Sequence, residues 1–325
     1  MRPGSPPRRR AWPPETGVAV VLLLISSWLA VHFPDFRTWD NLSAILKSAA
    51  EVAIVAAGMT LVIATGGIDI SVGSVVGLSS VAAGVLSVER GWPLWAAVGA
   101  CLAVGAACGL LNGILIARFR LPPIIATLAM FSAARAGAYV LSDGSSISGL
   151  PESLTNVGYG SAAGLPIPAW IALAALVSAG VLLRWTAFGR AVKALGGNRE
   201  AAFLSGLRTR RLEVAVYLIS GLLAGLSALV VTARGATAVP DAGKAFELSA
   251  ITAVVMGGTP VSGGSATATG TALGMLTIGV VANGVQSYGE GGVWVQLVLG
   301  ATLLVSVEVD RWRARRAARP RTDQR

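Results

Sequence analysis

The chain has 325 residues, of which 54% are hydrophobic, only 13% are charged and 40 are glycine, and its formal net charge is +10. Soluble domains carry about 25% charged residues, so this composition leaves too little polar surface for a water-exposed globule. It excludes a cytosolic enzyme, a disordered regulator and a secreted disulfide scaffold, and it indicates an all-α polytopic membrane protein with one domain.

Ten apolar runs, each bounded by glycine, proline or charge, predict about ten transmembrane helices, because about 20 apolar residues cross a bilayer. The runs are Val18–Phe33, Val52–Thr65, Val72–Val88, Trp92–Ala117, Ile124–Leu141, Ile167–Leu183, Val214–Val231, Leu248–Met256, Thr271–Val285 and Val293–Val309. The first run follows a basic segment, as in a signal peptide, but no small-x-small cleavage pattern follows it. We therefore expect an uncleaved first span.

The cationic residues are concentrated in the two ends of the chain, at Arg118 and Arg120, and between Arg184 and Arg211. If the N-terminus is inside, all these segments fall on the inner side, which is the positive-inside pattern. No aromatic side chains are interleaved with these arginines, so nucleic-acid binding is not expected. We expect basic cytoplasmic tails at 1–16 and 311–325 and a single transmembrane domain at 17–310.

Two of the runs, Val52–Thr65 and Leu248–Met256, are too short for a full helical crossing. Each is followed by the phrase GGxxxSxGS, and we interpret both as broken spans with irregular backbone that lines a cavity. Non-helical backbone at membrane depth is tolerated only there or inside protein. The motif residues are Gly66, Gly67, Asp69, Ser71 and Gly73 in the first phrase and Gly257, Gly258, Ser262 and Gly263 in the second.

Glycines spaced four apart recur inside the apolar runs, as in Gly105/Gly109/Gly113 and Gly221/Gly225. This spacing places the glycines on one helix face, where a second backbone can approach closely. The pattern predicts helix packing rather than a functional site.

Motifs for catalysis and metal binding are absent from the sequence, which has no GxxxxGK[ST], HExxH or CxxC. We expect no cofactor and no metal site in this chain. Any energy coupling would then come from an ion gradient or from a partner chain. Arg135 is nearly the only charge deep within a predicted span, whereas an ion-coupled carrier usually holds several there.

The loop at 185–211 contains more helix, turn and capping signals than any other predicted loop. It reads as a short basic helix, a Gly-Gly turn and a second short helix capped by Asn198. Ala201, Ala202 and Leu204 would form a small apolar face that inserts into a groove on a partner. From the residues alone, an ordinary positive-inside loop is an equal alternative.

Glu200-Ala201-Ala202, with Gly206 six positions after the glutamate, is similar to the EAA-type coupling loop of ABC importer permeases. With the segments 58–74 and 254–264, the chain resembles the permease subunits of ribose-type monosaccharide ABC importers, from about Asn41 to Asp310. Family members often carry Lys or Arg shortly after Ser-Gly-Gly, where this chain has Ser265-Ala266-Thr267.

The resemblance implies a vitamin-B12-type (type II) ABC importer permease architecture in the bacterial cytoplasmic (inner) membrane. The implied partners are a cytoplasmic ABC ATPase, a periplasmic or lipid-anchored sugar-binding protein, and a second permease subunit, identical or different. The residues implied for coupling to the ATPase are Gly189, Arg190, Gly196, Asn198, Glu200, Ala201, Ala202 and Gly206.

Scattered polar residues in the spans are the candidates for a weakly binding pore lining, since the resemblance places specificity in the separate binding protein. They are Asn112, Thr127, Ser132, Arg135, Asn283 and Gln286. The alternatives to a sugar permease are a branched-chain amino-acid or nucleoside ABC permease, an ion-coupled secondary carrier, and a non-transporting scaffold or receptor.

Overall fold

The computed structural model describes residues 15–287 and, beyond them, residues 294, 297, 300–302, 304 and 308. Helices make up most of this part of the chain. They are α1 (Thr16–His32), the 3-10 turn η1 (Pro34–Arg37), α2 (Trp39–Ala64), α3 (Val72–Gly84), the π-helical turn η2 (Val85–Glu89), α4 (Leu94–Ala117), α5 (Pro123–Leu141), α6 (Glu152–Tyr159), α7 (Ile167–Trp185), α8 (Ala187–Gly197), α9 (Arg199–Leu204), α10 (Thr209–Gly235), α11 (Phe246–Met256) and α12 (Ala268–Ser287). Two short antiparallel strand pairs join β1 (Ile147–Ser148) to β4 (Thr237–Ala238) and β2 (Ser161–Ala162) to β3 (Leu165–Pro166).

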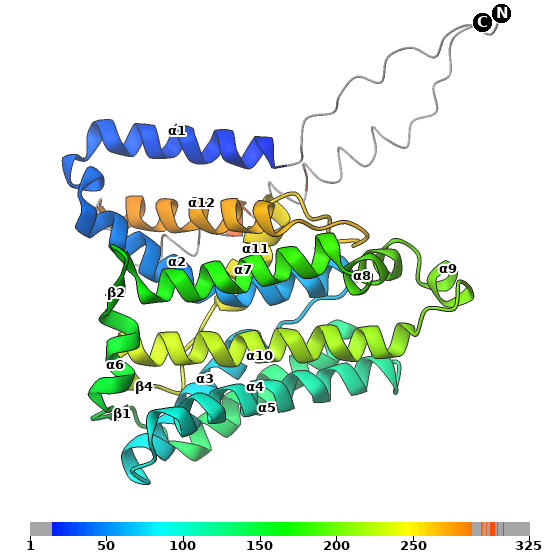
Figure 1. The fold of residues 1–325 in the computed structure, drawn as a ribbon, viewed down its shortest axis with the longest axis horizontal. Helices are drawn as coiled ribbons and strands as arrows, with labels where there is room; N and C mark the ends of the chain where they lie inside the picture. Colours follow the sequence, from blue (N-terminus) through cyan, green and yellow to red (C-terminus); the bar gives the residue numbers. More distant parts are fainter. Residues whose placement is uncertain are drawn as a thin grey trace, which may run out of the picture.

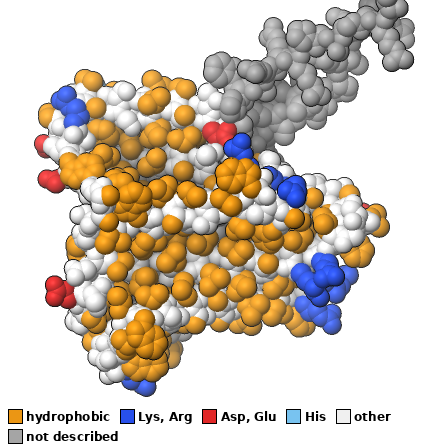
Figure 2. Space-filling model, in the orientation of Figure 1, with side chains coloured by type: hydrophobic (Ala, Val, Ile, Leu, Met, Phe, Trp, Pro, Cys, Tyr) orange, Lys and Arg blue, Asp and Glu red, His pale blue; other side chains and the backbone are white. Residues whose placement is uncertain are grey.

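The long helices lie side by side along one direction of the molecule (Figure 1). The helices α8 and α9 lie at one end of this bundle, here called the α8 end, and α6 lies with the strand pairs at the other, the α6 end. Hydrophobic side chains cover the middle of the visible face, and the charged side chains are mostly at its ends (Figure 2). This distribution is that of a bundle that spans a bilayer.

Seven helices of the described part are long and apolar enough to cross a membrane: α2, α3 continued through η2, α4, α5, α7, α10 and α12. Two shorter apolar helices, α1 and α11, accompany them. The prediction of an all-α polytopic membrane protein is confirmed, but a count of ten spans is not. The tenth expected span, Val293–Val309, lies mostly outside the described residues.

The prediction of a short span at Val52–Thr65 is wrong. The helix α2 begins at Trp39, because Thr38 caps it by accepting a hydrogen bond from the Asn41 amide at 3.3 Å. It continues to Ala64 and has 26 residues. Lys47 and Glu51 interrupt the apolar run in the sequence but not the helix. Glu51 is only 5% exposed, and an ion pair with Arg234 of α10 satisfies its carboxylate.

The glycines of α4 and α10 bring these two helices into backbone contact. A Cβ atom added to Gly105 would lie 2.2 Å from the Gly221 carbonyl oxygen, and one added to Gly109 would lie 2.3 Å from the Tyr217 carbonyl oxygen. Lipid provides no hydrophobic drive for helix association, so such close packing holds membrane helices together. The packing role predicted for this glycine spacing is confirmed.

We expect Gly105→Ala to lower the free energy of unfolding by about 1–3 kcal/mol, because the new methyl group has no room against α10. Gly99→Ala on the same helix is the matched control, since nothing lies within 4 Å of a Cβ atom there. Thermal unfolding of the detergent-solubilised protein measures both. Equal midpoints for the two variants would contradict the packing role.

Candidate functional site

The link 65–71 between α2 and α3 is irregular backbone inside the bundle, and Asp69 holds it in place. The Asp69 side chain is 1% exposed. Its Oδ1 accepts hydrogen bonds from the Ser71 amide at 3.0 Å and the Ser71 hydroxyl at 2.6 Å, and its Oδ2 accepts one from the Ser220 hydroxyl of α10 at 3.1 Å. Ser220 lies 11 residues into α10, or about 16 Å along the axis. The link therefore turns at membrane depth.

The α4 residue Asn112 completes this cluster by donating from Nδ2 to the Ser71 hydroxyl at 2.9 Å. Gly67 leaves room for Tyr217, since a Cβ atom there would lie 2.5 Å from the Tyr217 hydroxyl. The link is thus tied to both α4 and α10, and the first glycine phrase is a fixed part of the core. These contacts join four of the predicted residues: Gly67, Asp69, Ser71 and Asn112.

The two glycine phrases, far apart in the sequence, meet at the α8 end of the bundle. The Gly264 amide donates to the Ala64 carbonyl at 3.0 Å, where α2 ends. A Cβ atom added to Gly263 would lie 2.5 Å from the Gly66 nitrogen, and both residues have a positive φ. We call residues 64–67, 196–197 and 262–264 the glycine junction.

The end of α8 closes the glycine junction. A Cβ atom added to Gly196 would lie 2.0 Å from the Ala64 carbonyl oxygen and 2.6 Å from the Gly264 nitrogen. No residue larger than glycine fits between these two backbones. The predicted residues Gly66, Gly196 and Gly263 are therefore brought together, which no spacing in the sequence had indicated.

The second glycine phrase does not form the break that we predicted at membrane depth. The helix α11 is short, at 11 residues, as expected, but Gly257 and Gly258 end it on the side of the bundle where the glycine junction lies. The irregular part of this crossing instead precedes α11, in residues 239–245. Pro240, Gly243 and the left-handed Ala245 prevent a helix there.

This second irregular segment lies in a channel formed by small residues of α3. A Cβ atom at Gly84 would lie 2.6 Å from that of Ala238, and one at Gly77 would lie 2.5 Å from the Pro240 carbonyl oxygen. One at Gly73 would lie 2.4 Å from the Gly243 carbonyl oxygen. Since Gly73 and Gly84 are 11 residues apart, residues 238–243 extend through about 16 Å of membrane depth.

The helices α8 and α9 form the predicted pair in the loop 185–211. The Thr186 hydroxyl accepts from the Gly189 amide at 3.1 Å, and Asn198 Oδ1 accepts from the Ala201 amide at 2.9 Å. The prediction that Asn198 caps the second helix is confirmed. An ion pair between Arg199 and the buried Glu213 of α10 holds α9 against the bundle.

The predicted apolar face of Ala201, Ala202 and Leu204 is wrong in part. Ala202 is 4% exposed and packs inward, whereas Phe203 and Leu204 are 66% and 76% exposed. A six-residue helix has fewer than two turns, so its sequence shows no periodicity from which the inward-facing residue could be assigned. The exposed apolar surface of α9 therefore consists chiefly of Phe203 and Leu204. The helix itself lies at the tip of the α8 end (Figure 1).

A basic cavity of about 1230 Å³ lies beside α9, at the start of α5 and α10. Five arginines line it, namely Arg120, Arg199, Arg208, Arg210 and Arg211, together with Glu200 and Gly206. Of the coupling residues, Gly189 is buried against the end of α7, while Arg190, Glu200 and Ala201 are exposed.

The comparison with known families covers most of the chain. Residues 41–307 match the family described as "Branched-chain amino acid transport system / permease component". The chain belongs to this permease family. It is 38% identical over 306 residues to the ribose import permease protein RbsC of Escherichia coli (strain K12), covering 93% of this chain and 95% of that protein. It is 35% identical over 299 residues to the L-arabinose ABC transporter permease protein AraH of Azospirillum brasilense, covering 92% and 88%. No solved structure shows a significant match.

Three of the candidate pore-lining residues of this permease are engaged within its own packing. Asn112 is in the Asp69 cluster, and Thr127 is buried and donates to the Pro123 carbonyl at 2.9 Å. Asn283 of α12 and Asn41 of α2 exchange side-chain hydrogen bonds of 2.7 and 3.2 Å.

The other three candidates lie nearer the surface of the permease but not together. Ser132 on α5 and Gln286 on α12 are exposed, on separate helices. Arg135 is half-buried, and its guanidinium donates to the carbonyl oxygens of Pro240 at 2.5 Å and Ala242 at 3.4 Å. The six residues do not form one continuous lining, and their role stays a prediction.

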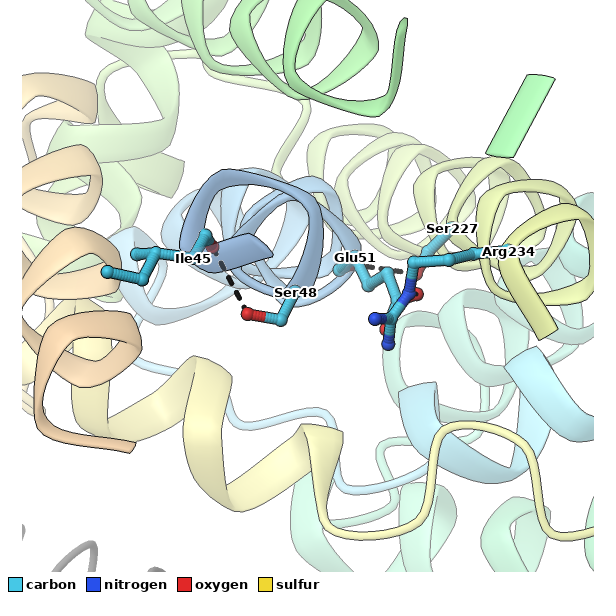
Figure 3. A network of polar contacts seen from close by, with 5 residues as sticks. All are labelled: Ile45, Ser48, Glu51, Ser227 and Arg234. Atoms are coloured by element: carbon cyan, nitrogen blue, oxygen red, sulfur yellow. Dashed lines mark hydrogen bonds and ion pairs between the residues drawn. The ribbon is translucent and has the colours of Figure 1, made fainter. Parts of the chain in front are cut away.

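Sequence reasoning missed a polar contact between α2 and α10 of the permease (Figure 3). Arg234 Nη2 donates to Glu51 Oε2 at 3.1 Å, and the Ser227 hydroxyl donates to the Glu51 carbonyl at 2.7 Å. An acidic residue at the edge of the long apolar run of α2 was the available signal, because a buried charge requires a partner. The partner lies 183 positions away and could not be named.

We expect Gly196→Ala to weaken transport by the permease at least tenfold, because the methyl group separates α8 from α2 at the glycine junction. The neighbouring variant Gly197→Ala is the control, since its Cβ atom would lie at an ordinary 4.0 Å from Gly264. Uptake in cells that express equal amounts of each variant tests this. Wild-type uptake by the Gly196 variant would show that the junction is not needed.

Proposed function

We propose that this permease is the membrane subunit of an ATP-driven importer for a monosaccharide such as ribose or arabinose. The observation that carries the proposal is the similarity, over more than nine-tenths of the chain, to permeases named for ribose and L-arabinose import. The permease would form the translocation pore, and a separate ABC ATPase would hydrolyse ATP.

The distribution of charge supports a cytoplasmic α8 end. The segments at this end carry most of the cationic side chains of the described loops, namely Arg118, Arg120, Arg184, Lys193 and the arginines of the basic cavity. Cationic side chains are visible at this end of the molecule, at the right of Figure 2. Cationic loops stay in the cytoplasm. The α6 end would then face the periplasm, both termini would be cytoplasmic, and the bundle would span the inner membrane.

We assign the coupling role to α8 and α9. Phe203 and Leu204 offer an exposed apolar tip that fits a groove on the ATPase, beside the basic cavity and the exposed Glu200. A movement of α8 would reach α2 and the second glycine phrase directly, because Gly196 contacts both backbones. Arg190, Asn198, Ala201 and Gly206 would position this tip.

The remaining partners follow from the same proposal. A periplasmic or lipid-anchored sugar-binding protein would dock on the α6 end, and a second permease subunit would complete the pore. We propose the vitamin-B12-type (type II) architecture with about ten spans for each subunit, with no metal or cofactor of its own.

The family description also names branched-chain amino acids, which makes an amino-acid importer the second candidate. Reconstitution of the permease with its ATPase and binding protein in liposomes separates the candidates. We expect ATP-dependent accumulation of a pentose and none of leucine. Accumulation by the permease alone under an ion gradient would instead establish a secondary carrier.

We expect Leu204→Asp to abolish copurification of the ATPase and ATP-driven uptake, while the permease inserts normally because the side chain is 76% exposed. Tyr159→Asp is the control for ATPase copurification alone, since this tyrosine is 58% exposed at the α6 end, where the binding protein and not the ATPase would dock. Copurification through a tag on the permease measures both. A Leu204 variant that retains the ATPase would refute docking through the α9 tip.

A further inference from the structure

Asp241 is an exposed carboxylate in the irregular segment that precedes α11. Its side chain is 54% exposed, and its Oδ1 lies 3.7 Å from Arg135 Nη1. Tyr139 lies one helical turn beyond Arg135 on the same face of α5, and its side chain is exposed. Asp241, Arg135 and Tyr139 thus form one polar group, which we call the Asp241 site.

The Asp241 site lies at membrane depth. It occupies the last two turns of α5, since Arg135 is six residues, or about 9 Å, and Tyr139 two residues, or about 3 Å, from the end of the helix at Leu141. The flanking Pro240 carbonyl contacts α3 at Gly77, between the contacts of Gly84 with Ala238 and of Gly73 with Gly243. A carboxylate at this depth does not face lipid, because charged side chains in a membrane face a bundle interior or a water-filled cavity.

The half-buried Arg135 fixes the backbone on both sides of Asp241. It donates to the carbonyl oxygens of Pro240 and Ala242, two groups that have no helix to satisfy them. It thereby sets the direction of the Asp241 side chain, which leaves the protein surface rather than entering the core. Gly77 makes room for this arrangement, since a Cβ atom there would lie 2.9 Å from Arg135 Nη1.

The chemistry of the exposed groups suits a neutral polyhydroxylated ligand. The Asp241 carboxylate accepts hydrogen bonds from hydroxyl groups, and charge-assisted bonds of this kind are the stronger ones. The Tyr139 ring is 40% exposed and offers an apolar face beside the carboxylate.

We propose that Asp241 and Tyr139, positioned by Arg135, form a sugar-contacting site in the wall of a water-filled translocation path. This inference rests on the proposed function, since it takes the importer's substrate to be a sugar. Asp241 contacts the sugar hydroxyls, Tyr139 contacts the sugar ring, and Arg135 acts through the backbone as a positioning residue.

Cysteine accessibility tests whether water reaches the site. The two native cysteines, Cys101 and Cys108, are buried, so Asp241→Cys introduces the accessible thiol. In the complete importer in liposomes, we expect a charged, membrane-impermeant methanethiosulfonate to label it and saturating ribose to slow the labelling at least fivefold. Leu173→Cys on α7, which is 47% exposed on an apolar helix, is the lipid-facing control and should not react. An unreactive cysteine at 241, or labelling that ribose leaves unchanged, would overturn the proposal.

Transport by the complete importer tests the sugar contact. We expect Asp241→Asn to reduce ribose uptake about tenfold, the effect of losing one hydrogen bond to a charged group. Tyr139→Ala, which removes the ring, should reduce it to a similar extent. Copurification of the ATPase and basal ATP hydrolysis should stay at wild-type levels. Asp143→Asn, the same change in the exposed turn beyond α5, is the control. Arg135→Lys should restore part of the uptake lost in Arg135→Gln, because one cation can still bind the two carbonyl oxygens.

The two proposals fail in different ways. If the wild-type importer takes up no sugar, the proposed function is wrong. If it imports ribose and the Asp241 and Tyr139 variants import it equally well, only the sugar-contacting site is wrong.

Discussion

Backbone N–H and C=O groups inside a bilayer have no water to bind, so each must find a partner within the protein. In this permease the long helices meet that constraint by themselves, and the two irregular segments at membrane depth meet it through side chains. Asp69 accepts the hydrogen bond of the Ser71 amide in the link 65–71, and Arg135 donates to the Pro240 and Ala242 carbonyls before α11. Both charges are therefore parts of the backbone structure as well as of the site.

Glycine decides where these irregular segments lie. The glycines spaced four apart on α4 and α10 allow these two helices to touch, whereas the glycines at 73, 77 and 84 of α3 admit a segment of successive turns instead of a helix. The same spacing thus serves two kinds of packing. At the glycine junction, three turns from distant parts of the sequence meet with room for hydrogen atoms only, so that α8 cannot shift without moving α2 and the turn at 262–264.

The sequence predicts the helical membrane class, the shortness of α11 and the Asn198 cap, because these depend on composition and local spacing. It predicts the family only through the resemblance of its motifs to those of known permeases. It fails at the start of α2, where Lys47 and Glu51 interrupt an apolar run. There the helix continues because Arg234, distant in sequence, satisfies Glu51. It also misplaces the second break, since the phrase GGxxxSxGS repeats while its surroundings do not. Which face of α9 is buried depends on the Arg199–Glu213 ion pair, another distant contact.

The two irregular segments lie in opposite halves of the bundle and meet at one place. The link 65–71 runs inward from the glycine junction to Asp69, and the segment before α11 runs inward from β4 to Gly243. They converge at Gly73, where the Gly243 carbonyl and the Glu247 carboxylate both contact the start of α3. A chain of contacts therefore joins the α8 end to the segment that carries Asp241 through the start of α3, without a continuous helix between them. The segment is held by the turn hydrogen bonds that the amides of Ala242, Lys244 and Phe246 donate to the carbonyls of Val239, Asp241 and Gly243, and by the two carbonyl contacts of Arg135. A displacement that reorients Asp241 therefore has to change both sets of contacts.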